Sequence, residues 1–249
     1  ISYRASKSVS TSGYSYMRVV GNGGDGDYLN RLTVNSTGVG YSGQVLLEGD
    51  VKVTGDGTLA NAGTISVTSG SVQWQNASGA DRTVDSNAGL GLHGGLIDFQ
   101  NAGVISMLAS STHGLIIKAN GNGGGGTSGG TIKLPTIAGN DSATQHINNL
   151  NVQAYEAGGS ITGYGGINVK GPITMNTAGA LKLTSTLAVA AEGLVDLRGQ
   201  QVTLSGGVTA TNGISLESYS GNLVTQALTD TGGDIDLLAN GGGAAVYTG

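Results

Sequence analysis

Cysteine is absent from this chain of 249 residues, and proline occurs only twice. Without cysteine the chain can form neither a disulfide nor a thiolate metal site. Collagen is excluded because it needs abundant proline together with glycine at every third position. No apolar run approaches the roughly 20 residues that a membrane-spanning helix requires, so no membrane span is expected.

Charged residues are also scarce, at 11% of the chain, and the formal net charge is −5. The 11 lysine and arginine residues are scattered along the sequence and form no basic stripe. Nucleic-acid binding depends on clustered cations that neutralise phosphates, so nucleic acid is not expected as a partner.

Glycine and short aliphatic phrases dominate the rest, with 47 glycines and 38% hydrophobic residues. A recurring phrase consists of glycine, an aliphatic residue, a polar residue and a second aliphatic residue. Clear copies are Gly193–Leu197, Gln201–Leu204, Gly213–Leu216 and Gly233–Leu237. Aliphatic residues two positions apart point to the same side of a strand, so each phrase predicts a short strand with one buried and one wet face.

The spacing of these phrases predicts how the strands are arranged. Three series recur with a common period near 20: Ile173, Val195, Ile214 and Ile235; Leu181, Val202 and Leu223; and Val189 and Val208. A chain that winds into coils of three short strands produces this pattern, because each strand lies above its counterpart in the preceding coil. We therefore predict an all-β fold, a single-stranded parallel β-helix (β-solenoid) with about three short strands per coil of about 20 residues.

The chain is expected to divide into an N-terminal segment of unlike composition, residues 1–20, and a solenoid over residues 21–249. Residues 121–130 form a glycine-rich loop, and residues 135–159 lose the period and are expected to leave the solenoid. Function tends to reside on loops that a rigid scaffold carries. We therefore take Asp141, His146 and Glu156 as candidates for a binding surface.

Three further residues are candidate site residues by type. Trp74, the only tryptophan, is expected either to cover an end of the apolar core or to lie on the outer face, where it could stack on a sugar. His93 and His113 fall beside glycines and, one predicted period apart, could stack in successive coils. Two imidazoles without a carboxylate at matched spacing make a weak metal site, so solvated turn histidines are the simpler interpretation.

The two ends of the sequence suggest assembly. After Leu237 the chain offers no amphipathic cap or charged edge, and a terminal coil without a cap exposes unpaired strand groups. The chain also begins at Ile1 without a methionine or signal peptide. We expect either self-association into filaments or continuation in a longer chain.

The phrase Gly-x-Ile-x-Leu, with Asn-Ala-Gly and Thr-Gly-Gly-Asp turns, resembles the shaft repeats of filamentous-haemagglutinin-type bacterial adhesins over residues 43–237. The resemblance implies a non-catalytic structural or adhesive shaft without a cofactor, secreted or at the cell surface, with a host cell or glycan as the possible ligand. The Asn-Pro-Asn signature of that family's secretion domain is absent, because neither Pro135 nor Pro172 stands between asparagines.

An enzyme is the alternative, since the expected architecture is similar to that of pectate lyases and polygalacturonases. Such sites need carboxylates stacked on one outer face across neighbouring coils. The candidates are Asp196, Glu217, Asp234 and Asp236. Because Ser215 separates Asp196 from Asp236 in the expected column, these two acids lie about two coil spacings, roughly 10 Å, apart. This separation favours a protein that is not an enzyme.

Two short N-terminal stretches carry resemblances of their own. Residues 1–17 resemble the first hypervariable loop of a mouse immunoglobulin kappa light chain, but the core residues of that fold do not follow. Residues 23–29 are similar to the repeat of calcium-binding toxin-type β-rolls, which makes Asp25 and Asp27 candidate Ca²⁺ ligands. Tyr28 departs from that repeat. A glycine- and aspartate-rich turn is the simpler interpretation of this stretch, and a calcium-binding module is a further alternative for the protein.

Overall fold

The computed structural model describes residues 31–35, 37–38, 41–42, 44–47, 49–53, 62–74, 81–88, 91–107, 113–123, 128–139 and 147–248. Within these ranges no helix is long and apolar enough to cross a membrane. The described strands form three parallel sheets and one short antiparallel pair, β2 (Thr37–Gly38) with β3 (Tyr41–Ser42).

Each parallel sheet takes its strands from successive coils, in chain order. Sheet 1 contains β1 (Arg31–Asn35), β6 (Thr64–Ser69), β9 (Leu96–Asp98), β12 (Thr131–Leu134), β15 (Ser160–Gly163), β18 (Ala180–Leu183), β21 (Gln201–Leu204), β24 (Leu223–Thr225) and β27 (Ala245–Tyr247). Sheet 2 contains β4 (Gln44–Leu47), β7 (Ser71–Trp74), β10 (Val104–Met107), β13 (Thr136–Gly139), β16 (Ile167–Val169), β19 (Val189–Ala191), β22 (Val208–Ala210) and β25 (Leu228–Asp230). Sheet 3 contains β5 (Val51–Lys52), β8 (Arg82–Asp85), β11 (Leu115–Lys118), β14 (Leu150–Ala154), β17 (Ile173–Thr177), β20 (Val195–Gly199), β23 (Ile214–Ser218) and β26 (Ile235–Ala239).

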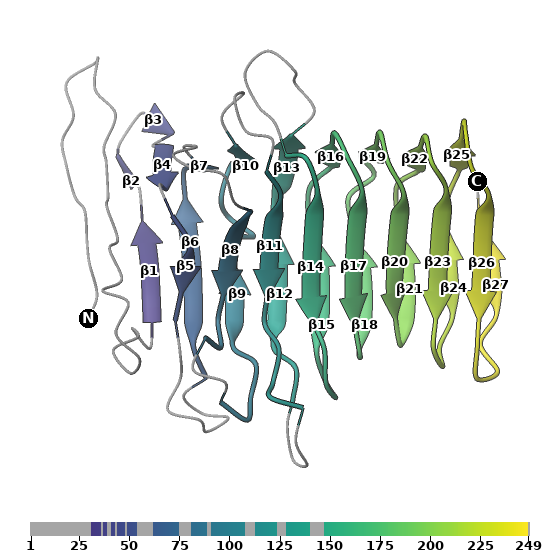
Figure 1. Ribbon diagram of the computed structural model, residues 1–249, viewed down its shortest axis with the longest axis horizontal. Coiled ribbons are helices and arrows are strands. Elements are labelled where there is room, and N and C mark those ends of the chain that lie inside the picture. Colours follow the sequence, from purple (N-terminus) through teal and green to yellow (C-terminus); the bar gives the residue numbers. More distant parts are fainter. Residues whose placement is uncertain are drawn as a thin grey trace.

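The chain passes through the three sheets in turn, so each circuit forms one coil of a solenoid (Figure 1). Every strand of these sheets runs parallel to its counterparts in the adjacent coils. The strands therefore stack side by side along the long axis of the molecule (Figure 1). This arrangement confirms the predicted all-β parallel β-helix.

The apolar core runs along the inside of the coils. In β17, β20 and β23 buried and partly exposed residues alternate, as a pleated strand with one inward face requires. Val195 pairs in register with Ile173 and with Ile214, and Leu181, Val202 and Leu223 form a second inward column. The predicted aliphatic columns are confirmed.

Coil length is less uniform than the sequence pattern indicates. From Ile161 onward the register partners in sheet 1 are Leu181, Val202 and Leu223, so the spacing stays close to the predicted period. Earlier partners lie much farther apart in the sequence, as in Ile65 with Ile97 and Ile97 with Ile132. The strands that pair in this region are therefore separated by more residues than the predicted period.

The described parts of residues 135–159, a stretch expected to leave the solenoid, belong to it, whereas residues 140–146 lie outside the described residues. The stretch contains β13 and β14, which pair in register with strands on both sides.

Stacked glycines form the corner that leads into sheet 1. The Gly95 carbonyl oxygen accepts a hydrogen bond from the Thr131 amide at 3.0 Å. The same oxygen lies only 1.9 Å from the position that a Cβ added to Gly130 would take. The Gly63 carbonyl oxygen likewise lies 1.9 Å from the position of a Cβ added to Gly95. Close backbone approach across coils thus requires a residue without a side chain at these positions.

The C-terminal coil exposes residues of the inward columns. Ile235 and Leu237, the counterparts of the buried Ile214 and Leu216, are both 42% exposed. In the described part of the chain, β25, β26 and β27 are the last strands of their sheets. One end of the solenoid therefore presents an apolar cross-section and open strand edges.

Candidate functional site

The outer face of sheet 3 carries a network of polar side chains that runs across several strands. Its strands are in register, so one outward residue from each forms a continuous column. The column comprises Lys52, Asp85, Lys118, Gln153, Asn176, Arg198, Glu217 and Leu238. Cross-strand pairs of this kind stabilise a sheet and oppose slippage of its register.

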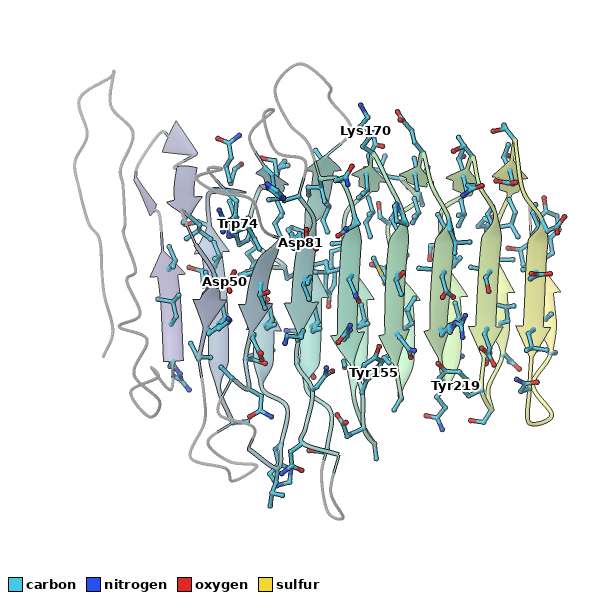
Figure 2. All side chains as sticks on the ribbon, in the orientation of Figure 1. Asp50, Trp74, Asp81, Tyr155, Lys170 and Tyr219 are labelled. Carbon is cyan, nitrogen blue, oxygen red and sulfur yellow. The ribbon has the colours of Figure 1, made fainter. Side chains whose placement is uncertain are left out.

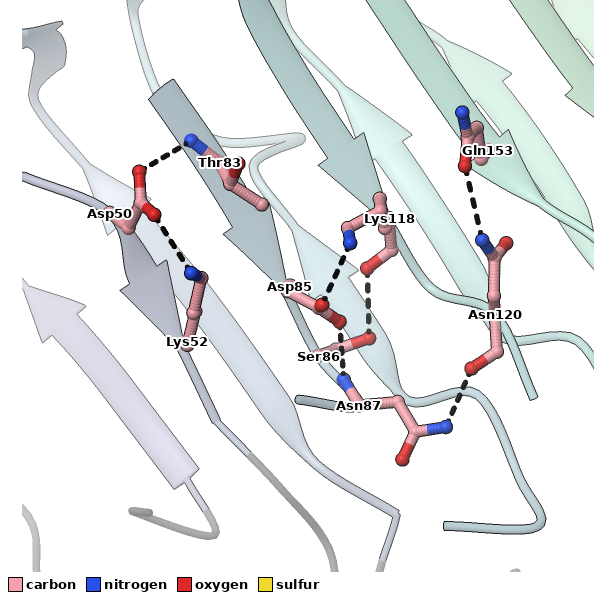
Figure 3. Close-up of polar contacts among 9 residues, drawn as sticks. All are labelled: Asp50, Lys52, Thr83, Asp85, Ser86, Asn87, Lys118, Asn120 and Gln153. Atoms are coloured by element: carbon pink, nitrogen blue, oxygen red, sulfur yellow. Dashed lines mark hydrogen bonds and ion pairs between the residues drawn. The ribbon is translucent and has the colours of Figure 1, made fainter. Parts of the chain in front are cut away.

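Alternating charges occupy the N-terminal half of this column (Figure 3). Lys118 lies 3.3 Å from Asp85, and Lys52 lies 2.8 Å from Asp50. Asp50 also accepts a hydrogen bond from the Thr83 amide at 2.9 Å, which ties β5 to β8. Exposed ion pairs contribute at most about 1 kcal/mol each, so the geometry favours a role in alignment over one in chemistry.

Two asparagines continue the network around the next corner (Figure 3). The Asn87 side chain donates to the carbonyl oxygens of Gly91 and Asn120, at 2.8 and 2.6 Å. The Asn120 side chain accepts from the Tyr155 amide at 2.9 Å and donates to Gln153 at 3.2 Å. These amides satisfy backbone groups of successive coils and hold the corners in line.

The acids considered for catalysis lie farther along the same sheet. Asp196 is in register with Ser215, and Ser215 with Asp236, so the predicted separation of the two aspartates by one coil is confirmed. Asp196 accepts from Arg198 Nε at 2.7 Å, and Glu217 lies 3.6 Å from another nitrogen of that guanidinium. The hydrogen bond from Arg198 to Asp196 is the main cause that raises the pKa of Arg198.

The fourth acid, Asp234, is exposed in the turn before β26, and its carbonyl oxygen accepts from the Ile214 amide. It therefore stands outside the column that contains Asp196 and Asp236. The four acids do not converge on one point of the described surface.

Trp74 requires a correction, because it does not lie on the outer face. Its side chain is fully buried, and it continues an inward column between Leu47 and Met107. The indole Nε1 donates to the Gly49 carbonyl oxygen at 3.2 Å. The alternation in β7 that turns Val72 inward also turns Trp74 inward, so it is not available for stacking on a sugar.

The two histidines do not stack. His93 precedes β9 of sheet 1, and His113 precedes β11 of sheet 3, so they occupy different corners. His93 Nδ1 instead lies 2.8 Å from Ser128 Oγ, across one coil boundary. In this region successive coils are longer than the predicted period, so two residues one period apart do not stack.

Glu156 lies at a corner and secures the beginning of the glycine-rich loop. Its Oε2 accepts a hydrogen bond from the Gly121 amide at 2.7 Å, and its own φ is 69°. A non-glycine residue in this left-handed region is uncommon. The carboxylate is thus committed to a backbone contact between two coils.

The remaining predicted residues, Asp25, Asp27, Asp141 and His146, lie outside the described residues. Within the described ranges, no group of three or more histidine, aspartate or glutamate side chains is placed to hold a metal ion.

Two tyrosines that the sequence interpretation did not select lie on this face. Tyr155 directly follows β14 and Tyr219 directly follows β23, and both lie near the same border of the structure (Figure 2). The charges of Asp196 and Arg198 act on both side chains. Their common position immediately after a strand of the same sheet is a signal in the sequence. This signal can be recognised only after the strands have been assigned to sheets.

Asp230 secures the turn beneath the last coil. Its Oδ1 accepts from the Gly213 amide at 3.0 Å, and its Oδ2 accepts from the amides of Gly232 and Gly233. The Gly213 hydrogen bond is the main cause that lowers the pKa of Asp230, against an opposing effect of desolvation.

Because the pKa of Asp230 is lowered in the folded state, the carboxylate contributes stability above its ordinary pKa, and this contribution is lost as the pH falls through the folded pKa. We expect the difference in unfolding free energy between the wild type and Asp230→Asn to shrink from about pH 5 to pH 2. Urea unfolding at several pH values measures it. A difference that stays constant over this range would contradict the assigned role.

Comparison of the chain with models of protein families, with curated proteins and with solved structures finds no match.

Proposed function

We propose that this chain is part of a non-catalytic structural or adhesive shaft, secreted or held at a bacterial cell surface. The observation that supports the proposal best is the continuity of the three parallel sheets around one apolar core. Nine strands of sheet 1 in the described residues, at about 4.8 Å each, span roughly 40 Å. Such a scaffold extends by adding coils.

The polar network also supports a structural role. Asp85, Asp196 and Glu217 each face a cation in the same sheet. Side chains committed to one another across strands hold the register of a long stack. The absence of cysteine is compatible with export of the chain as an unfolded polypeptide.

We further propose that another coil covers the last described coil, supplied either by a second copy of the chain, end to end, or by continuation of the same chain. A further coil placed on β26 and β27 would bury the apolar residues there and pair the open edges of both strands. Because the two ends of a solenoid differ, contacts between copies are head to tail and propagate into fibres.

Substitution of the exposed inward residue Leu237 tests this contact. We expect Leu237→Asp to abolish a concentration-dependent increase in light scattering, because a carboxylate would be buried without a partner between two coils. The matched control is Leu187→Asp, since Leu187 is 61% exposed in a corner away from the last coil.

Electron microscopy of the wild type should show filaments one solenoid wide. A wild type that remains a monomer at all concentrations would refute end-to-end association. Equal loss in both variants would indicate general solubilisation instead of a specific contact.

A further inference from the structure

Aromatic and charged side chains lie together near the ends of four neighbouring strands of sheet 3, β14, β17, β20 and β23. We call it the tyrosine cluster, and its members are Tyr155, Asn176, Asp196, Arg198, Glu217 and Tyr219. The two tyrosines lie near the same border of the sheet in Figure 2. They come from coils that are separated by β17 and β20.

Tyr219 reaches across an intervening strand. Its hydroxyl donates to Asn176 Oδ1 at 2.9 Å, although β20 lies between β23 and β17. Arg198 is the register partner of Asn176, so the tyrosine side chain spans the coil that carries this arginine. Partial burial, followed by the charge of Glu217, raises the pKa of Tyr219. The phenol is therefore protonated at neutral pH.

Tyr155 lies on the other side of this charged pair from Tyr219, because it directly follows β14 and the pair lies on β20. Partial burial is the main cause that raises its pKa; the charge of Asp196 adds to the rise and that of Arg198 opposes it. These two residues lie on β20, two strands from β14. Tyr155 keeps 37% of its surface exposed. Two partly exposed rings thus flank one fixed ion pair.

The charges select the class of ligand. Arg198 is held by Asp196 and approached by Glu217, yet its side chain remains 41% exposed. One cation next to two carboxylates repels a sulfated or phosphorylated ligand. The carboxylates can accept hydrogen bonds, the guanidinium can donate them, and the amide of Asn176 can do both.

We propose that the tyrosine cluster binds a neutral oligosaccharide. Tyrosine offers a rigid apolar ring with a polar tip at low entropic cost, and such a ring can contact the apolar C–H face of a sugar. Sugar hydroxyls both donate and accept, which matches the fixed polar groups between the rings. The inference deepens the proposed adhesive function by naming a ligand class, but it does not depend on end-to-end association.

The test is a binding assay with defined probes. The purified chain is applied to an array of neutral hexasaccharides, including β-1,4-linked glucose and α-linked mannose, with heparin as the anionic comparison. The strongest neutral probe is then titrated by calorimetry. We expect Tyr155→Ala and Tyr219→Ala each to weaken binding by roughly tenfold, the factor that corresponds to about 1.4 kcal/mol.

Two further variants separate binding from folding. Tyr219→Phe keeps the ring and loses the hydrogen bond to Asn176, so it should retain most of the affinity. Tyr164→Ala removes a tyrosine of similar exposure at another corner and should leave binding unchanged. Thermal unfolding shows which variants are folded.

The proposal is overturned if no neutral probe binds, if heparin binds more tightly than every neutral probe, or if Tyr164→Ala weakens binding as much as the cluster variants. Glycan binding without filaments would leave this inference standing and refute only the proposed association. Filaments without glycan binding would refute this inference and leave the proposed association standing.

Discussion

Replacing Gly130 with alanine should lower the free energy of unfolding by about 3 kcal/mol or more, at the upper end of the cost of overpacking. An added Cβ would meet the Gly95 carbonyl oxygen at 1.9 Å, and two further backbone atoms lie within 3.0 Å of it. That oxygen cannot move aside without loss of its hydrogen bond from the Thr131 amide. The clash would therefore separate two adjacent coils.

The control for Gly130→Ala is Gly49→Ala. Among the described residues, apart from its chain neighbours, no atom lies within 4 Å of a Cβ added to Gly49, so this substitution should change stability by less than about 1 kcal/mol. Urea unfolding followed by circular dichroism measures both. Similar losses for the two variants would show that backbone entropy, and not stacking, explains the use of glycine here.

Leu197→Ala should lower the free energy of unfolding by about 2–5 kcal/mol, because it leaves a cavity in a continuous core. Leu197 is fully buried and lies in register between Met175 and Leu216, so neighbours in two coils lose contacts. In a stack of coils each unit depends on its neighbours, and one cavity weakens both interfaces.

Leu194→Ala is the control for Leu197→Ala, because Leu194 lies in the corner just before the same strand and is partly exposed. Its loss should be well below that of Leu197. Hydrogen exchange should also show that Leu197→Ala loosens the amides of β17 and β23 more than those of β11. If protection fell equally throughout the chain, the coils would behave as one cooperative unit and not as coupled neighbours.

The alternation of aliphatic and polar residues sufficed to predict the strands and the fold class. Between Ile161 and Leu237 the coils have nearly constant length, so the residues that stack, such as Val195 and Ile214, could be paired by counting. The separation of Asp196 from Asp236 followed from the same count. When all coils have the same length, the number of residues between two positions shows whether they stack in neighbouring coils.

Counting failed where the corners lengthen. His93 and His113 are one predicted period apart, yet they lie at different corners, because the coils in that region are much longer than the period. Trp74 was misplaced for another reason. Its residue type suggested a binding surface, although its place in the alternation that begins with Val72 already directed it inward.

The order of residues was enough to predict that they form short strands and that the strands coil around a shared apolar core. This prediction is possible because the alternation of residues within a strand and the spacing between strands can both be read directly from the order of the residues. The placement of Tyr155 and Tyr219 on either side of the strand that carries Arg198 follows only from the folded chain. It depends on the register summed over three coils, and a shift of one residue in any coil would turn these side chains to the other face.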